Sequence, residues 1–252
     1  MRVDRSFMVL LAAAAVVVVT SSAGLWQLDR ARQKQDLHDA MTARQAMAPL
    51  DSGALPCRAD DWAAQQHRPA RLQGRWLHEH TVYLDNRVMA GRAGFVVLTP
   101  LMLDDSGDCE ADVVLVQRGW VPRDPRDRTL VPDVTPSDET VTVDVRLAAA
   151  PSRLLELGSP ASGPQGALRQ NVDVNALALE WGLDLRPGSV QQLADESPRP
   201  AQAVALQRHW WQPSADVGKH QAYAAQWFAM ATIVAALYAW FHWWRPWRAA
   251  LS

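Results

Sequence analysis

Two long windows without a charged side chain lie at opposite ends of the chain and constrain its architecture more than any other feature. The windows cover residues 6–28 and 220–244. Each exceeds the roughly 20 residues that a helix needs to cross a bilayer core about 30 Å thick. Seven of the twelve tryptophans lie beyond residue 209, and tryptophan collects at membrane interfaces. The sequence therefore predicts transmembrane helices over residues 7–28 and 219–244.

The first window also has the features of a cleavable signal peptide. Arg2 and Arg5, a short apolar stretch and the small residues SSAG fit that interpretation, with a conceivable cut after Ala23. Against it, GLWQL resumes the apolar character, and no Gly or Pro follows before Pro49. We favour a retained anchor that continues as a helix over residues 29–48.

With two anchors, both termini share one side of the membrane and the residues between the anchors form a domain on the other side. Charges near the helix ends leave the orientation open, because the cations after the first window match those before it. The net charge of -2 gives no indication of nucleic acid binding. The expected parts are an N-terminus at 1–6, the anchors at 7–28 and 219–244, a helix at 29–48, a β-rich domain at 49–218 and a tail at 245–252.

Runs rich in β-branched and aromatic residues alternate with Pro/Gly-rich breaks in the middle of the chain, which predicts strands. One helix is expected at 173–183, and short links such as HEH at 78–80 suggest hairpins. The fold class is therefore an α+β membrane protein, with two transmembrane helices flanking a mainly antiparallel, barrel-like domain. The expected strands lie at 67–77, 81–86, 93–103, 111–121, 139–148, 166–173 and 203–211.

Few residues of the domain suggest chemistry. Cys57 and Cys109 have neither a zinc spacing nor a redox CxxC pattern, and the sequence leaves open a disulfide or two thiols. His78 and His80, together with His67, could bind a metal ion, but a solvated turn explains them better. No P-loop, nucleophile elbow or HExxH motif occurs in the sequence.

An arginine-rich stretch, VLVQRGWVPRDPRDR, ends one of the expected strands. Its forked guanidinium groups, from Arg118 to Arg128, could grip carboxylates such as haem propionates. The alternating Asp and Arg residues fit a solvated loop better.

His220 stands at the start of the second window. Tyr223 and Trp227 follow at i+3 and i+7, with Ala224 between them, so all four share one helix face. Such a face could hold haem, with the imidazole on the iron. Locally, an interfacial histidine beside belt aromatics explains the pattern better.

Several motifs nevertheless occur together in one order along nearly the whole chain. GLWQLDRARQK places Gly24, Trp26, Gln27 and Arg30 in a Gly-x-Trp-Gln-x-x-Arg signature. The strand motifs GRW, LDNR, GRAGFVVLTPL and VLVQRGWVP follow, and HQAYAAQWFAMA opens the second window. In this arrangement the chain resembles the Surfeit-locus (SURF-one, Shy-type) family of cytochrome c oxidase assembly proteins.

The resemblance implies a multi-pass protein of the inner (cytoplasmic) membrane, with its main domain on the periplasmic, extracytoplasmic side and both termini inside. It implies a chaperone with no catalytic residue and no metal site, which assists transfer or insertion of haem a into oxidase subunit I. The expected partners are cytochrome c oxidase subunit I, haem A synthase and the lipid bilayer. By motif, His220 matches the haem axial ligand, and Tyr223, Trp227 and Phe228 match its aromatic neighbours.

Two other classes of function stay open. A scaffold could hold haem synthase and oxidase subunits together without binding haem, and a membrane-tethered enzyme is the third alternative. The insert after Trp120 and the loop at residues 51–67 depart from the family pattern, which puts partner specificity in doubt.

Overall fold

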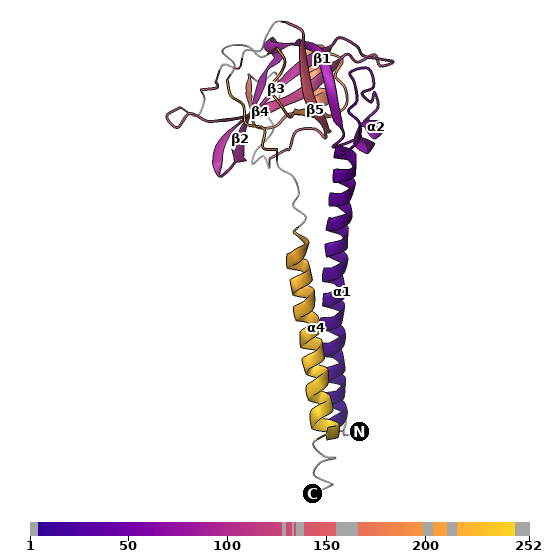
Figure 1. Ribbon diagram of the computed structural model, residues 1–252. Coiled ribbons are helices and arrows are strands. Elements are labelled where there is room, and N and C mark those ends of the chain that lie inside the picture. The colour runs from indigo at the N-terminus through magenta and orange to yellow at the C-terminus, as the bar shows by residue number, and fades with distance from the viewer. Residues whose placement is uncertain are drawn as a thin grey trace. The chain divides into compact units, whose positions relative to one another are not determined.

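The structure is a computed structural model that describes residues 5–127, 130–132, 134, 139–154, 166–198, 204–210 and 216–244. The chain divides into two compact units (Figure 1). One is a helical unit, formed by residues 1–40 and 212–252. The other is a β unit, Met41–Trp211.

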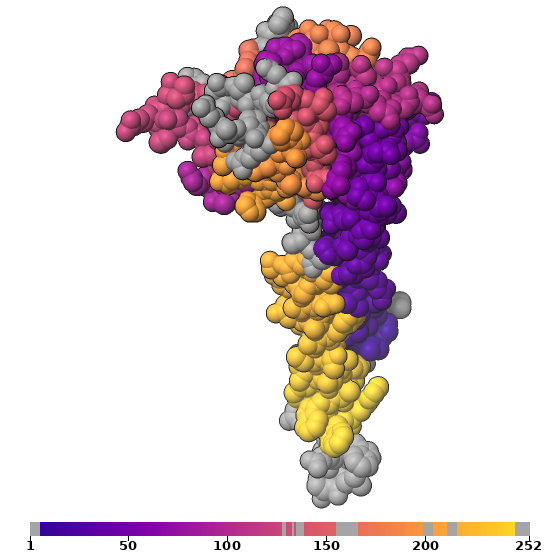
Figure 2. All heavy atoms as spheres, turned by 45° about the horizontal axis from the view of Figure 1, so that its top comes forward, coloured from indigo at the N-terminus to yellow at the C-terminus, as the bar shows by residue number. Residues whose placement is uncertain are grey.

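The helical unit contains two long helices that run side by side in both views (Figures 1 and 2). The first is α1, Arg5–Gln45, an uninterrupted helix of 41 residues. The second is α4, Val217–Ala239, which ends in a short π-helical segment, η2, Trp240–Trp244. Both helices are long and apolar enough to cross a membrane. Helix α1 covers the expected anchor at 7–28 and continues through the expected helix at 29–48 as far as Gln45.

Five strands of the β unit form a closed barrel in the order β1, β5, β7, β4 and β3, with β3 pairing back onto β1. The pairings described are antiparallel except β4 with β7 and β2 with β6. The barrel-like, mainly antiparallel domain is thus confirmed, with a mixed sheet. The strands are β1, Pro69–Trp76; β2, Val82–Met89; β3, Arg92–Leu103; β4, Val113–Pro122; β5, Val141–Ala148; β6, Leu168–Arg169; and β7, Ser189–Gln192.

The hairpin expected at HEH is wrong. β1 and β2 do not pair with each other, because each pairs with a different end of the long strand β3. The residues between them form a short 3-10 helix, η1, His78–His80. Gly74 allows β1 to approach β3 closely, since a Cβ atom there would lie 2.1 Å from the Met102 carbonyl oxygen. The missing side chain therefore helps the barrel to close.

Other elements differ from the expected ones in length, and two were not expected. The expected strand at 166–173 reduces to β6, and the described part of 203–211 forms only a bridge between Gln207 and Trp120. β7 and the short helix α2, Ala59–Ala64, were not expected. The expected helix is α3, Val174–Trp181, where the Asp173 side chain accepts hydrogen bonds from two backbone amides of the first turn.

Hydrophobic residues fill the barrel and cover its outside. The main core cluster includes Leu72, Leu101 and Val143, all completely buried. Helix α3 contributes Leu177 to a second cluster against Leu84. Strand β4 is consequently buried along almost its whole length, which explains why its first part, Val113–Val116, is a continuous apolar run and not an alternating one.

Candidate functional site

The candidate site lies in the helical unit, where small residues line the buried faces of the two long helices. Thr20, Gly24 and Ala31 are buried on α1, and Ala224 and Ala231 are buried on α4. A Cβ atom at Gly24 would lie 2.8 Å from the ring of Phe228, so the two helices touch at this point. Small residues allow apolar helices to approach closely in a bilayer.

His220 is joined to α1 by a hydrogen bond inside this helix pair. Its Nδ1 lies 2.8 Å from Oε1 of Gln27, a residue 193 positions earlier in the chain. With the amide oxygen of Gln27 as the acceptor, the neutral form of the ring has its proton on Nδ1 and a lone pair on Nε2. The described residues offer Nε2 no hydrogen bond, and Nε2 is not among the buried atoms that lack one. One ring nitrogen is therefore fixed and the other is left available as a ligand.

The three aromatic residues predicted beside His220 lie differently. Tyr223 is 54% exposed, and Trp227 is half-buried. Phe228 packs on Gly24 and belongs to the contact between the helices. Ala224, which shares the His220 face, is only 1% exposed and is not free to approach a ligand. On this face Tyr223 is exposed and His220 is half-buried, whereas Ala224 is covered.

This arrangement fits an axial ligand of haem iron. Histidines that bind metals usually donate their second ring N–H to a carbonyl or carboxylate group, which fixes the ring orientation and tautomer. Gln27 supplies such an acceptor to His220. The nitrogen that remains is the type of ligand that haem iron takes from proteins.

Arg118 is not accessible to a ligand, because it is buried inside the β unit at 3% exposure. Its Nη2 lies 2.8 Å from Oε1 of Glu196, and its guanidinium lies over the ring of Trp76 at 4.5 Å. Burial lowers the pKa of Arg118, and the nearby Glu196 carboxylate opposes that shift. Arg118 is therefore part of a buried ion pair, whereas Arg128 of the same stretch lies outside the described residues.

The histidines of η1 do not meet a third ligand. Among the residues that the structure describes, no group of three or more His, Cys, Asp or Glu side chains is placed to hold a metal ion. His80 instead lies near the ring of Trp181 on α3, with 5.2 Å between the ring centroids. His67 is half-buried, and burial lowers its pKa, with smaller effects from Arg146 and Arg44.

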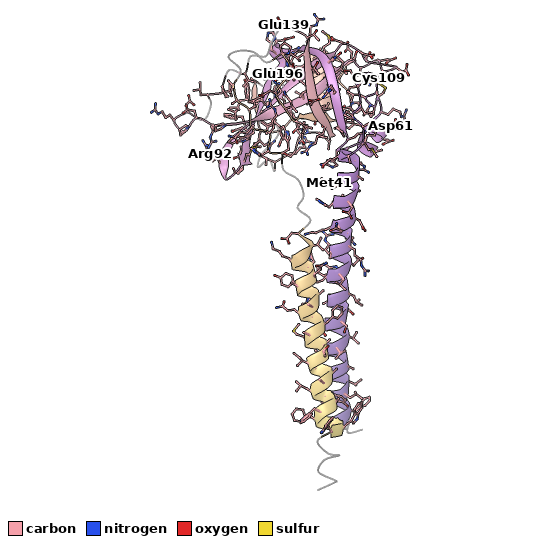
Figure 3. The ribbon with its side chains drawn as sticks, in the orientation of Figure 1. Met41, Asp61, Arg92, Cys109, Glu139 and Glu196 are labelled. Carbon is pink, nitrogen blue, oxygen red and sulfur yellow. A yellow bond between two sulfur atoms is a disulfide. The ribbon has the colours of Figure 1, made fainter. Side chains whose placement is uncertain are left out.

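The two cysteines, for which the sequence left two states open, form a disulfide. The Cα atoms of Cys57 and Cys109 are 5.5 Å apart. Figure 3 shows Cys109 in the β unit.

Three residues of these sites were missed by reasoning from the sequence. Gln27 was assigned to the membrane interface, although a polar side chain within an apolar window is itself a signal of function. Glu196 and Arg186, which contact Arg118 and Cys109 respectively, lie 78 and 77 residues from their partners. No local sequence pattern predicts contacts between residues that are so far apart in the chain.

Comparison with known proteins gives a family match over most of the chain. A model described as the SURF1 family matches residues 14–232. The cytochrome oxidase assembly protein SHY1 of Saccharomyces cerevisiae is 28% identical over 182 residues, which cover 70% of this chain and 44% of that protein.

Two further relatives match over shorter regions. A SURF1-like protein of Monosiga brevicollis is 33% identical over 113 residues, 41% of this chain and 41% of the relative. A SURF1-like protein of Drosophila melanogaster is 29% identical over 120 residues, 41% of this chain and 38% of the relative. The matched regions thus span less than half the length of these curated relatives.

Proposed function

Because the chain belongs to the SURF1 family, we propose that it is a membrane-anchored assembly factor of cytochrome c oxidase that holds haem a in transit through His220. The observation that carries the haem part of this proposal is the hydrogen bond between His220 and Gln27. The assembly role has support from the name of the yeast relative, a cytochrome oxidase assembly protein.

The anchored architecture follows from the two long apolar helices. In this proposal both helices cross the inner membrane, both termini lie on the cytoplasmic side and the β unit lies outside. In this proposal α1 is a retained anchor, which is continuous through Ala23 to Gln45. The disulfide supports an extracytoplasmic β unit, since disulfides persist mainly in oxidising compartments.

The proposed site binds and orients, and it performs no covalent chemistry. In this proposal Oε1 of Gln27 accepts a hydrogen bond from Nδ1–H of His220 and fixes the orientation of the ring. When bound, haem a would supply an iron atom with an axial position for a nitrogen ligand. Tyr223 and Trp227 would contribute aromatic surface at the edge of that ligand.

Transfer requires that the haem be held weakly enough to leave. His220 as a single ligand from the chain would hold the haem more weakly than two ligands would, which suits transfer. Haem A synthase as donor and oxidase subunit I as acceptor complete the proposal.

A scaffold that brings these partners together without haem is the main rival. It requires the family fold and the anchors, but it gives no role to the orientation of His220. A tethered enzyme is less well supported, because the sequence has no nucleophile elbow, P-loop or HExxH motif.

The test is to co-express the full chain with a haem A synthase, purify it in detergent and titrate the haem by its visible spectrum. His220→Ala should abolish the axial-ligand signature. Gln27→Leu should weaken haem binding by about 10–100-fold, as loss of a partner to a ligating histidine usually does. Gln226→Leu, a change at an exposed glutamine on α4, serves as the matched control.

The outcomes separate the two functions. Full haem occupancy with an unchanged spectrum in His220→Ala would overturn the ligand assignment. A wild-type chain that restores oxidase assembly yet never carries haem would favour the scaffold. Equal haem affinity in the Gln27 and Gln226 variants would show that the hydrogen bond between His220 and Gln27 has no role in haem binding.

A further inference from the structure

The disulfide of the β unit joins two surface loops and is exposed on one side only. Cys57 lies in the loop before α2, and Cys109 lies in the connection between β3 and β4. Cys57 is exposed to solvent, whereas Cys109 is 9% exposed. A nucleophile from solution can therefore reach the sulfur of Cys57 more easily than that of Cys109.

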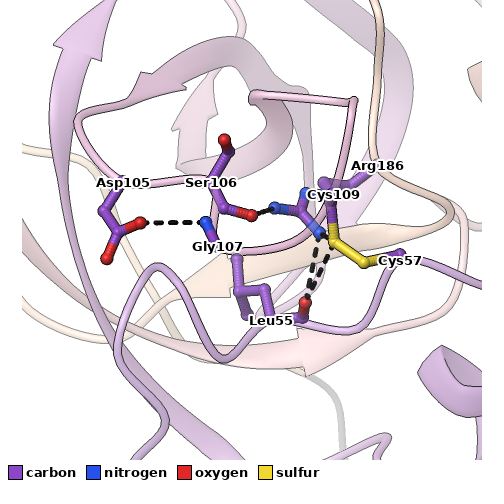
Figure 4. Close-up of a disulfide and its surroundings, with 7 residues drawn as sticks. All are labelled: Leu55, Cys57, Asp105, Ser106, Gly107, Cys109 and Arg186. Carbon is purple, nitrogen blue, oxygen red and sulfur yellow. Dashed lines mark hydrogen bonds between the residues drawn. A yellow bond between two sulfur atoms is a disulfide. The ribbon is translucent and has the colours of Figure 1, made fainter.

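A fully buried guanidinium group lies against the protected sulfur. Arg186 has 0% exposure, and its Nη1 contacts Sγ of Cys109 and lies 3.5 Å from Sγ of Cys57. The same group donates hydrogen bonds to the Leu55 carbonyl at 3.1 Å and to the Ser106 carbonyl at 2.6 Å (Figure 4). Arg186 thus holds a positive charge directly beside the disulfide.

This charge has no carboxylate in contact with it within the described ranges. Burial lowers the pKa of Arg186, and Asp112 opposes the shift from beyond ion-pairing distance. Neutral carbonyl oxygens and sulfur atoms are its direct neighbours. A buried cation without a counter-ion is costly, so a new negative charge at this point would be favourable.

From this geometry we infer that Cys57 and Cys109 form a thiol–disulfide exchange site whose substrate is an exposed dithiol. A thiolate of the dithiol attacks Sγ of Cys57 and forms a mixed disulfide. The Cys57–Cys109 bond breaks, and its electron pair remains on Sγ of Cys109 as a thiolate beside Arg186. The second thiolate of the substrate then attacks the substrate sulfur that is bonded to Cys57. This step releases Cys57 as a thiolate, which takes up a proton. The substrate leaves as a disulfide, and the protein has gained two electrons.

Two physical effects favour this course. A thiol with a low pKa is the better leaving group, and thiolates are stabilised next to arginine. Stabilisation of the reduced form also makes a disulfide more oxidising. Reduction at this site replaces an unpaired buried cation with an ion pair. The ion pair makes Cys109 a better leaving group and also makes the disulfide more oxidising.

The two loops stay in contact by other means when the disulfide opens. A Cβ atom at Gly107 would lie 2.2 Å from the Gly53 carbonyl oxygen, so the backbones already touch. Asp105 caps the turn by accepting a hydrogen bond from the Gly107 amide at 2.9 Å (Figure 4). The reduced site therefore keeps a framework that holds Cys109 next to Arg186.

The first test measures the thiol pKa of each cysteine in the full chain, from the thiolate absorbance as a function of pH. In Cys57→Ser the remaining Cys109 should titrate at least one unit below the ~8.5 of an ordinary cysteine. In the matched variant Cys109→Ser, the exposed Cys57 should titrate near ~8.5. Because burial alone raises a thiol pKa, a value for Cys109 at or above ~8.5 would overturn the proposal.

The second test equilibrates the full chain in detergent with reduced and oxidised dithiothreitol and counts free thiols by alkylation. Arg186→Met should shift the equilibrium at least tenfold toward the disulfide, about 30 mV in potential. Arg146→Met is the control, since Arg146 is also buried but donates to Gln191 and not to sulfur. Equal shifts in both variants would refute the role of Arg186. If Arg186→Met does not fold, the thiol pKa values decide alone.

Discussion

Removing one charge of the buried ion pair between Arg118 and Glu196 should destabilise the β unit strongly. Both side chains are almost inaccessible, at 3% and 4% exposure, and their atoms lie 2.8 Å apart. The second carboxylate oxygen of Glu196 accepts a hydrogen bond from Gln192 at 3.0 Å. Glu196→Gln keeps the size of the side chain but leaves the guanidinium of Arg118 without a counter-ion.

The expected loss follows from the burial of this pair. Breaking a buried pair by removing one partner costs about 3–5 kcal/mol, because the remaining charge stays desolvated. The glutamine oxygen can still accept a hydrogen bond from Arg118, which favours the lower end, about 3 kcal/mol. For a unit of this size each kcal/mol corresponds to roughly 2–4 °C, so Tm should fall by about 6–12 °C.

Thermal unfolding of the full chain in detergent, followed by near-ultraviolet circular dichroism, measures this change. The matched control is Asp144→Asn, which breaks the pair between Arg71 and Asp144 at the same 2.8 Å distance. These side chains are 65% and 47% exposed, and an exposed pair contributes about 0–1 kcal/mol. A shift in Glu196→Gln no larger than that in Asp144→Asn would refute the reasoning. Replacing both members of the buried pair with Met and Leu should recover much of the loss.

Three further predictions concern other parts of the chain. Gly24→Ala should destabilise the helical unit by about 1–3 kcal/mol through overpacking against Phe228, measured by the far-ultraviolet signal on heating; Gly218→Ala, with nothing within 4 Å of the new Cβ, should not. Since burial lowers the pKa of His67, the unfolded chain binds the proton first, and stability should fall as the pH drops below about 6.5. His67→Asn, which tolerates the local φ of 73°, should flatten the dependence of Tm on pH in that range; an unchanged slope would contradict the assignment. Asp173→Ala should lower the free energy of unfolding by about 1 kcal/mol, because it removes the N-cap of α3. An unchanged midpoint of denaturant-induced unfolding would exclude that role.

Much of the fold could be predicted because its signals are local. A charge-free window of more than 20 residues predicts a long apolar helix, and α1 and α4 are such helices. The helix expected at 173–183 corresponds to α3, Val174–Trp181, and the structure shows Asp173 as its N-cap. Strands β2 to β5 carry enough β-branched residues to be recognised singly.

Strand pairing could not be predicted in the same way. HEH at 78–80 is short enough for a hairpin, yet β1 and β2 both pair with β3. β7, which has only four residues, closes the barrel by pairing with β4 and β5. Its stability depends on partners that lie far away in the chain, so its own sequence carries little signal.

The candidate site shows the same division. The family motif identified His220, and helix geometry placed Tyr223 and Trp227 near it. The hydrogen bond from His220 to Gln27 depends on how the two helices meet. The packing of Phe228 on Gly24 has the same origin.

The sequence by itself determined where the chain is apolar, which segments form the long helices, and which residue types are available for chemistry. Those properties depend on neighbours within a few positions. Only the tertiary structure decided which charges are buried together and which nitrogen of His220 is free. It also decided that Cys57 and Cys109 are joined beside Arg186. These contacts bring together residues that are far apart in the chain, and their energies depend on burial, which no short stretch of sequence specifies.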